Sequence, residues 1–122
     1  PEARAAAAHR ICHAMAAEPW YVAGTDRFCT KVMEVTGAKA AIKTGAEGVY
    51  MGALPELGLG ICVKAADGAG RASEVAMGAV LRMLGVIDEV EEAKLHATLE
   101  PVIKNWAGTT TGRILPGSEA RF

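Results

Sequence analysis

Three consecutive residues, Lys43, Thr44 and Gly45, have the types and order that can form one side of an active site. They follow the apolar pair Ala41 and Ile42, as expected at the end of a short strand. A strand lysine supplies a positive charge or, where it is removed from water, a neutral amine base. The glycine lets a substrate approach the backbone closely. From the residue types alone, the commoner explanation of Lys43 is an edge-strand lysine that discourages aggregation.

Cys29 is a second candidate. It lies in the first turn of an expected helix, where the helix dipole lowers the pKa of a thiol. A cysteine nucleophile needs a histidine beside it, and none of the three histidines is close to Cys29 in the sequence. Burial as a small apolar residue accounts for Cys29 equally well, because free cysteines are commonly buried.

Neither a metal site nor a serine nucleophile is evident. His9 and His13 flank Cys12 within one expected helix, at the i, i+4 spacing that can chelate a metal. No second cluster of ligands accompanies them, so we expect a surface pair and no metal site in this chain. The two serines, Ser73 and Ser118, are not followed by a lysine three positions later.

The composition fits one small domain. The chain has 122 residues and a formal net charge of -1 with both signs mixed along it, which argues against binding of nucleic acid. No apolar run reaches the roughly 18 residues of a transmembrane helix, so we expect no membrane partner. The three cysteines have no metal-site spacing and indicate free thiols in a reducing, cytoplasmic compartment. Alanine accounts for 24 residues, so helices form readily but bury little area. We therefore expect this segment to pack against a partner surface, either a further part of its own chain or another subunit.

The hydrophobic periodicity predicts an α+β fold in which helices pack against an antiparallel sheet. We expect helices over residues 2–17, 26–36, 71–84 and 88–99, and a three-stranded meander over residues 39–44, 49–54 and 59–66. The first helix is expected to place Ile11 on an apolar face, and the strand over 59–66 is expected to place Cys62 in the core. The inward side chains of the last two helices are expected to be Ala72, Val75, Ala76, Ala79, Val80 and Met83 in one and Val90, Leu95 and Leu99 in the other. Residues 19–24 are expected to be a connection, with Thr25 capping the next helix and Gly37 ending it. A further strand is expected near residues 110–115, followed by a loose end over residues 116–122.

This order of elements resembles the C-terminal part of the β-lactamase and penicillin-binding fold, in which a Lys-Thr-Gly strand lines the active site of a serine hydrolase. Serine-dependent glutaminases are similar and carry Lys-Ser-Gly at the same place.

A closer resemblance is to the bacterial L-asparaginase II family of the rhizobial type. It is carried by Val-Ala-Gly-Thr-Asp-Arg-Phe-Cys-Thr at residues 22–30 and by Lys-Thr-Gly-Ala-Glu-Gly-Val-Tyr at residues 43–50. Further matches follow in the family's order: Gly-Leu-Gly at residues 58–60, Lys64, Asp-Gly at 67–68, Arg-Ala at 71–72, Pro-Val at 101–102, Asn-Trp-Ala-Gly at 105–108 and Thr-Gly-Arg-Ile at 111–114. The resemblance covers nearly the whole chain but about the last third of a family member.

The resemblance implies a serine-type amidohydrolase that converts L-asparagine to L-aspartate and ammonia. In that family the nucleophile is a serine within Ser-x-x-Lys, assisted by a second serine and by the strand lysine, which maps to Lys43. A zinc ion near the site is held by cysteines and a lysine, and Cys29 matches a cysteine close to that metal. The nucleophile and the zinc ligands are then expected upstream of Pro1, so residues 1–122 are expected to be the C-terminal fragment of one catalytic domain.

With the family motif around it, Lys43 becomes the expected catalytic residue of this chain. Thr44 and Gly45 are expected to line the substrate pocket, where a hydroxyl or backbone N–H meets the substrate carboxylate, although turn chemistry also accounts for Gly45. Glu47 is a candidate for binding the substrate α-amino group, and a solvated turn residue is its more frequent alternative.

Other functions stay open. A glutaminase or another β-lactamase-like acyl hydrolase differs in pocket length, which the sequence does not reveal. An inactive truncated copy, acting only as an interaction domain, would lack an upstream Ser-x-x-Lys. We expect a homodimer, and we expect the isolated fragment to be inactive and to self-associate, because its Ala-rich helices and open sheet lack their covering half.

Overall fold

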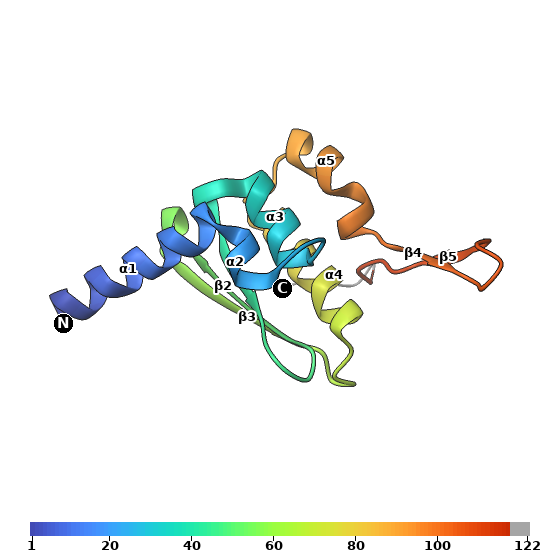
Figure 1. Ribbon diagram of the computed structural model, residues 1–122, viewed down its shortest axis with the longest axis horizontal. Helices are drawn as coiled ribbons and strands as arrows, with labels where there is room; N and C mark the ends of the chain where they lie inside the picture. The colour runs from blue at the N-terminus through green and yellow to red at the C-terminus, as the bar shows by residue number, and fades with distance from the viewer. Residues whose placement is uncertain (118–122) are drawn as a thin grey trace.

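Helices pack against a small antiparallel sheet in the computed structural model, which describes residues 1–117. The fold class is therefore α+β, as predicted. The first helix extends from one end of the body, and a separate β-hairpin extends from the other (Figure 1). Within residues 1–117, no helix is both long and apolar enough to cross a membrane.

The three-stranded sheet is the predicted meander. β1 (Ala41–Thr44), β2 (Val49–Leu54) and β3 (Leu59–Lys64) are antiparallel neighbours in that order. β1 starts later than expected because η1 (Gly37–Lys39) is a 3₁₀ turn. A second 3₁₀ turn, η2 (Pro55–Leu57), joins β2 to β3, and β3 ends earlier than expected where the chain turns toward the next helix.

The core lies between one face of this sheet and the helices α3 (Phe28–Thr36) and α4 (Gly70–Met83). The sheet contributes three nearly fully buried side chains: Ile42, Tyr50 and Leu54. Because successive strand residues point to opposite faces, Lys43 lies on the other face of the sheet. This face is open around Lys43, where the cross-strand neighbours Met51 and Cys62 are also exposed, whereas Ala41 farther along β1 is buried. α3 also covers β1 from the side, since the backbone N–H of Ile42 donates a hydrogen bond to Met33 Sδ at 3.4 Å.

The N-terminal helix α1 (Glu2–Ala17) has the predicted bounds but buries none of its residues. Ile11, which was expected on an apolar face, is 61% exposed. Alanine favours the helix without removing much area from water, so α1 contributes little to the core. The need for a further covering surface stays a prediction.

The segment before α3 differs from the prediction. Residues 19–23 form a short helix, α2 (Pro19–Ala23), where a connection was expected. Thr25 does not cap α3, because its hydroxyl accepts a hydrogen bond from Trp20 Nε1 at 2.9 Å. Asp26 adopts a positive φ of 58°, which turns the chain so that α3 begins only at Phe28, with its ring in the core.

α4 buries a face that overlaps the predicted one only at Val75. The sequence indicated a stripe of small and medium apolar residues: Ala72, Val75, Ala76, Ala79, Val80 and Met83. The buried residues are Ser73, Val75, Met77, Gly78 and Leu81. Met77 and Leu81 remove more area from water than alanines do, so they face the core. The alanines instead line a shallow groove with residues 114–117.

α5 (Glu89–Leu99) begins with the acids that the sequence places in its first turn. Asp88 and Glu91 form a capping box, in which the backbone N–H of each donates to the other's carboxylate at 3.0 and 2.9 Å. Leu95 and Leu99 are buried as predicted, whereas Val90 is exposed.

A second hairpin follows α5. β4 (Val102–Lys104) pairs with β5 (Thr110–Arg113), and only β5 was predicted. β4 was missed because its three residues are all exposed and show no alternation. Trp106 lies fully exposed in the connecting turn. Residues 118–122 of the expected loose end lie outside the described residues.

Candidate active site

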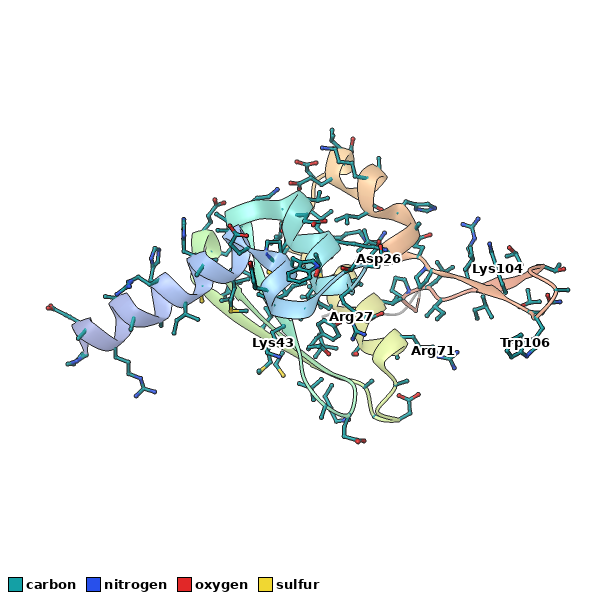
Figure 2. The ribbon with its side chains drawn as sticks, viewed as in Figure 1. Asp26, Arg27, Lys43, Arg71, Lys104 and Trp106 are labelled. Atoms are coloured by element: carbon teal, nitrogen blue, oxygen red, sulfur yellow. The ribbon has the colours of Figure 1, made fainter. Side chains whose placement is uncertain are left out.

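Lys43 lies on the open face of the sheet (Figure 2). It pairs with Met51 on β2, which pairs with Cys62 on β3, so the three side chains share that face. The Lys43 ammonium donates a hydrogen bond to the Thr44 carbonyl at 3.1 Å. Its side chain is exposed, so residues 1–117 present Lys43 without removing it from water.

Cys62 was expected in the core and lies instead on this open face. Its neighbours Ile61 and Val63 pack against the core cluster. Because a strand alternates, the residue between two inward-facing ones must face outward.

Thr44 and Gly45 continue β1 toward its turn. Thr44 is half-buried on the core side, across from Tyr50. The backbone N–H of Gly45 donates to the Val49 carbonyl at 2.7 Å, which closes the hairpin. A Cβ on Gly45 would lie 3.2 Å from Val49 Cβ, so a side chain there would crowd the turn. The geometry of the turn is enough to explain why residue 45 is a glycine, whether or not it contacts a substrate. The role of Thr44 and Gly45 in substrate binding stays a prediction.

Glu47 is an exposed turn residue with a positive φ of 58°. Its carboxylate lies beside Gly68, in the loop between β3 and α4: a Cβ on Gly68 would be 3.1 Å from Glu47 Oε2. Its carbonyl accepts a hydrogen bond from Lys64. The structure therefore directs Glu47 toward that loop, and binding of an α-amino group by Glu47 stays a prediction.

Cys29 is buried in the first turn of α3. Burial raises the pKa of its thiol above the ordinary value of 9.0, and the adjacent Tyr50 hydroxyl and Thr44 backbone N–H offset this only in part. The predicted acidification of Cys29 by the helix dipole is therefore wrong, because loss of hydration outweighs it. Burial as a small apolar residue describes its place in the core.

A partly buried polar cluster around Cys29, formed with Tyr50 and Glu74, was not anticipated. The Tyr50 hydroxyl donates to Glu74 Oε1 of α4 at 3.2 Å, and its ring packs edge-on against Phe28 with centroids 5.4 Å apart. Burial first, and then the adjacent Cys29 and Glu74, raise the pKa of Tyr50 above its ordinary value of 10.0. No local spacing in the sequence signals this cluster, because its residues come from α3, β2 and α4. The cluster lies on the core side, so the structure does not bring Cys29 together with Lys43.

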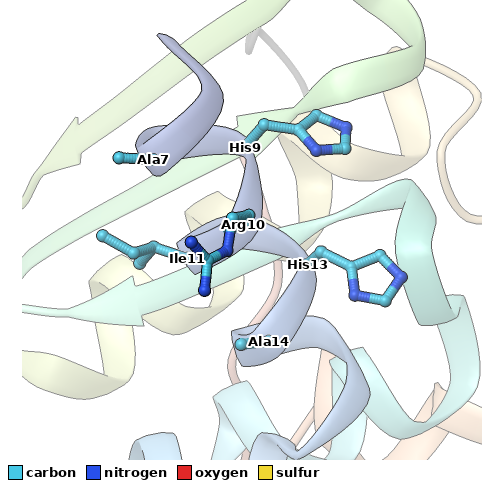
Figure 3. A pocket seen from close by; sticks show the side chains of 6 residues that line it. All are labelled: Ala7, His9, Arg10, Ile11, His13 and Ala14. Atoms are coloured by element: carbon cyan, nitrogen blue, oxygen red, sulfur yellow. The ribbon is translucent and has the colours of Figure 1, made fainter. Parts of the chain in front are cut away.

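No metal site forms within residues 1–117, where no group of three or more His, Cys, Asp or Glu side chains is placed to hold an ion. His9 and His13 are exposed on α1, as expected of a surface pair (Figure 3). Figure 3 shows them along one helix flank beside a shallow hollow that α1 itself lines. Because the described residues supply no zinc site, we assign no step to zinc.

Comparison with known protein families gives a match over nearly the whole chain. The family model for L-asparaginase II matches residues 1–116, which include both hairpins and every candidate site residue. No curated protein matches the chain.

Proposed function

The chain belongs to the L-asparaginase II family, and from this premise we propose that it forms part of an active site that hydrolyses L-asparagine to L-aspartate and ammonia. The family supports an asparaginase-type amidohydrolase acting on an amide. The observation that carries the proposal is the placement of Lys43, presented on the open face of a strand whose other face is anchored in the core.

The anchoring of β1 supports a catalytic role for Lys43. Ile42 before it is fully buried, and Thr44 after it is half-buried opposite Tyr50. A side chain between two anchored neighbours is held in position by the backbone, as a catalytic group requires. The exposed side chain of Lys43 is long enough to reach a group on another part of the protein that covers this face of the sheet.

In the proposed reaction a serine outside this chain attacks the side-chain amide carbon of asparagine. The Ser O–C bond forms, the C–N bond breaks, and nitrogen leaves as ammonia with the proton from the serine hydroxyl. Water then attacks the ester carbon, its proton returns to the serine oxygen, and aspartate is released. Lys43 assists as a proton carrier or as a positive charge that stabilises the developing oxyanion, and Thr44 and Gly45 contact the substrate.

One observation favours a small amide over a peptide substrate. A peptide that added to β1 as a further strand would need free backbone groups along the outer edge of β1. The N–H of Ile42 is already bonded to Met33 Sδ, and Ala40 and Ala41 are buried. The substrate of a glutaminase is longer than that of an asparaginase by one methylene group. The assay below compares the two substrates directly.

The test is ammonia release from L-asparagine and L-glutamine by the full-length protein and its Lys43→Ala variant. We expect asparagine turnover that falls by on the order of a hundredfold or more in the variant while the thermal midpoint is kept. Lys104→Ala, which removes an exposed strand lysine in the second hairpin, is the matched control and should leave turnover unchanged. Unchanged turnover in Lys43→Ala would return Lys43 to an edge-strand role, and faster glutamine turnover would favour a glutaminase.

A further inference from the structure

The turn between β1 and β2 does not stand alone in solvent, because it rests on the loop between β3 and α4. A Cβ on Gly48 would lie 2.8 Å from the carbonyl carbon of Gly68, so the two backbones approach as closely as glycines allow. The backbone N–H of Ala65 donates to the Gly48 carbonyl at 2.9 Å. The turn that follows Lys43, Thr44 and Gly45 is thus in direct contact with residues 65–68.

Lys64 joins these two segments. Its ammonium donates to the Glu47 carbonyl at 2.6 Å and to the Ala65 carbonyl at 2.5 Å, so one charged group binds one backbone oxygen from each side. Hydrogen bonds from a charged donor are stronger than neutral ones. Lys64 pairs with Val49, which places it on the same sheet face as Lys43.

The turn needs such a contact. Glu47 holds a positive φ of 58°, a conformation that costs free energy for a residue with a side chain and persists where the surroundings enforce it. The carbonyl that Glu47 presents in this conformation is the one that Lys64 binds. The lysine therefore stabilises the strained residue directly.

We propose that Lys64 is a positioning residue for the amide hydrolysis proposed above: its ammonium fixes the turn at residues 45–48 against the loop at residues 65–68 and thereby sets where Lys43, Thr44 and Gly45 present their groups. The inference rests on the proposed function for its kinetic consequence and on the structure for its geometry. Two of the three N–H donors of Lys64 bind backbone oxygens. Lys64 therefore affects the reaction by holding the turn in place and not by contact with the substrate.

The kinetic test compares Lys64→Met, Lys64→Arg and the control Lys104→Met in the full-length protein. Met keeps the apolar stem and removes every donor, whereas Arg keeps charge and several donors. We expect kcat for L-asparagine to fall on the order of tenfold in Lys64→Met with KM changed much less, because a small misplacement of reacting groups slows the chemical step. Lys64→Arg should recover most of that loss, and Lys104→Met should match the unsubstituted protein.

A second readout does not depend on activity. Hydrogen exchange of backbone amides over residues 45–50 and 65–68 should be faster in Lys64→Met than in the parent, and the exchange of α3 should be unchanged. Unchanged exchange in these segments overturns the proposal whatever the kinetics show. Faster exchange with unchanged kcat also overturns it, because the lysine would then hold the turn without serving the reaction.

Failure of the proposed function is distinguishable from failure of this inference. If the parent protein releases ammonia from neither amide, the asparaginase proposal fails. Exchange alone then decides whether Lys64 positions the turn, and retention of protection in Lys64→Arg but not in Lys64→Met supports it.

Discussion

The chain contains two β-hairpins that differ in how much of the molecule holds them. The hairpin of β1 and β2 contributes Ile42, Tyr50 and Leu54 to the core, is covered at its edge by α3, and has its turn bound by Lys64. The hairpin of β4 and β5 projects from the body, and the residues of β4 are all exposed (Figure 1). The connecting turn of each hairpin contains a glycine with positive φ, which is Gly48 in the first hairpin and Gly108 in the second.

The comparison shows that local turn chemistry forms a hairpin, whereas packing fixes its position. A two-stranded hairpin alone is at best marginally stable in water. The first hairpin is stabilised from its core face, its edge and its turn, so a side chain on its open face has a defined place. The role proposed for Lys43 depends on this difference between the two hairpins. The predictions below test the contrast from the largest expected effect to the smallest.

Truncation of a strand isoleucine should separate the two hairpins most. Ile42→Ala removes a fully buried side chain from the core and should lower the free energy of unfolding by about 3–5 kcal/mol. Ile103→Ala removes one that is 39% exposed on β4 and should cost less than about 1 kcal/mol. Urea unfolding of both variants measures the difference. Equal costs would mean that the first hairpin is no better packed than the second.

The turn glycines give a smaller contrast. Gly48→Ala combines a positive φ of 68° with backbone contact at Gly68 and should cost about 2–3 kcal/mol. Gly108→Ala has a positive φ of 80° but no atom within 4 Å of the new Cβ, so about 1 kcal/mol is expected from the backbone alone. Thermal midpoints of the two variants provide the measurement, and a larger shift for Gly108→Ala would contradict the contact that we describe.

Alkaline pH should weaken the first hairpin through its buried groups. The pKa of Cys29 is raised in the folded state, so its contribution is fully present below the ordinary value of 9.0 and is lost as the pH rises through the folded value. Urea midpoints should therefore fall as the pH rises above about 9, and they should fall less in Cys29→Ala. If the urea midpoints of the variant and the parent fall equally with pH, the loss of stability comes from groups other than Cys29, and Tyr50 is the next one to test.

Truncation of the exposed turn tryptophan should have the smallest effect. Trp106 is fully exposed, so Trp106→Ala should change the free energy of unfolding by no more than about 0.5 kcal/mol. The urea midpoint is the measurement again. A large loss would show that Trp106 is buried in the protein as it exists in solution, and the contrast between the hairpins would then hold only for the isolated chain.

The sequence predicted those elements that have clear periodicity. The bounds of α1 and β2 were correct, and the meander was found because apolar strand residues alternate between glycine-containing turns. β4 was missed since its three residues never enter the core and so carry no alternating pattern. For α4 the small residues suggested one face, but the longer side chains of Met77 and Leu81 determined another.

Sequence reasoning could name candidate residues that are neighbours along a strand, but not residues that meet across separate elements. Lys43, Thr44 and Gly45 are adjacent in sequence, so their type and order could be recognised directly. The cluster of Cys29, Tyr50 and Glu74 joins three separate elements, and neither its burial nor its effect on the Cys29 pKa follows from local spacing. Cys62 illustrates the same limit, because its face depended on how Ile61 and Val63 pack.

The sulfur of Met33 accepts a hydrogen bond from the Ile42 N–H, so its oxidation can report how often α3 separates from β1. Met33 is 1% exposed, so an oxidant reaches its sulfur only while α3 is lifted from β1. Met51 and Met83 are about half exposed and are open to the same oxidant at all times. The ratio of sulfoxide formation at Met33 to that at Met51 therefore reports how often the covered edge of the Lys-Thr-Gly strand is uncovered.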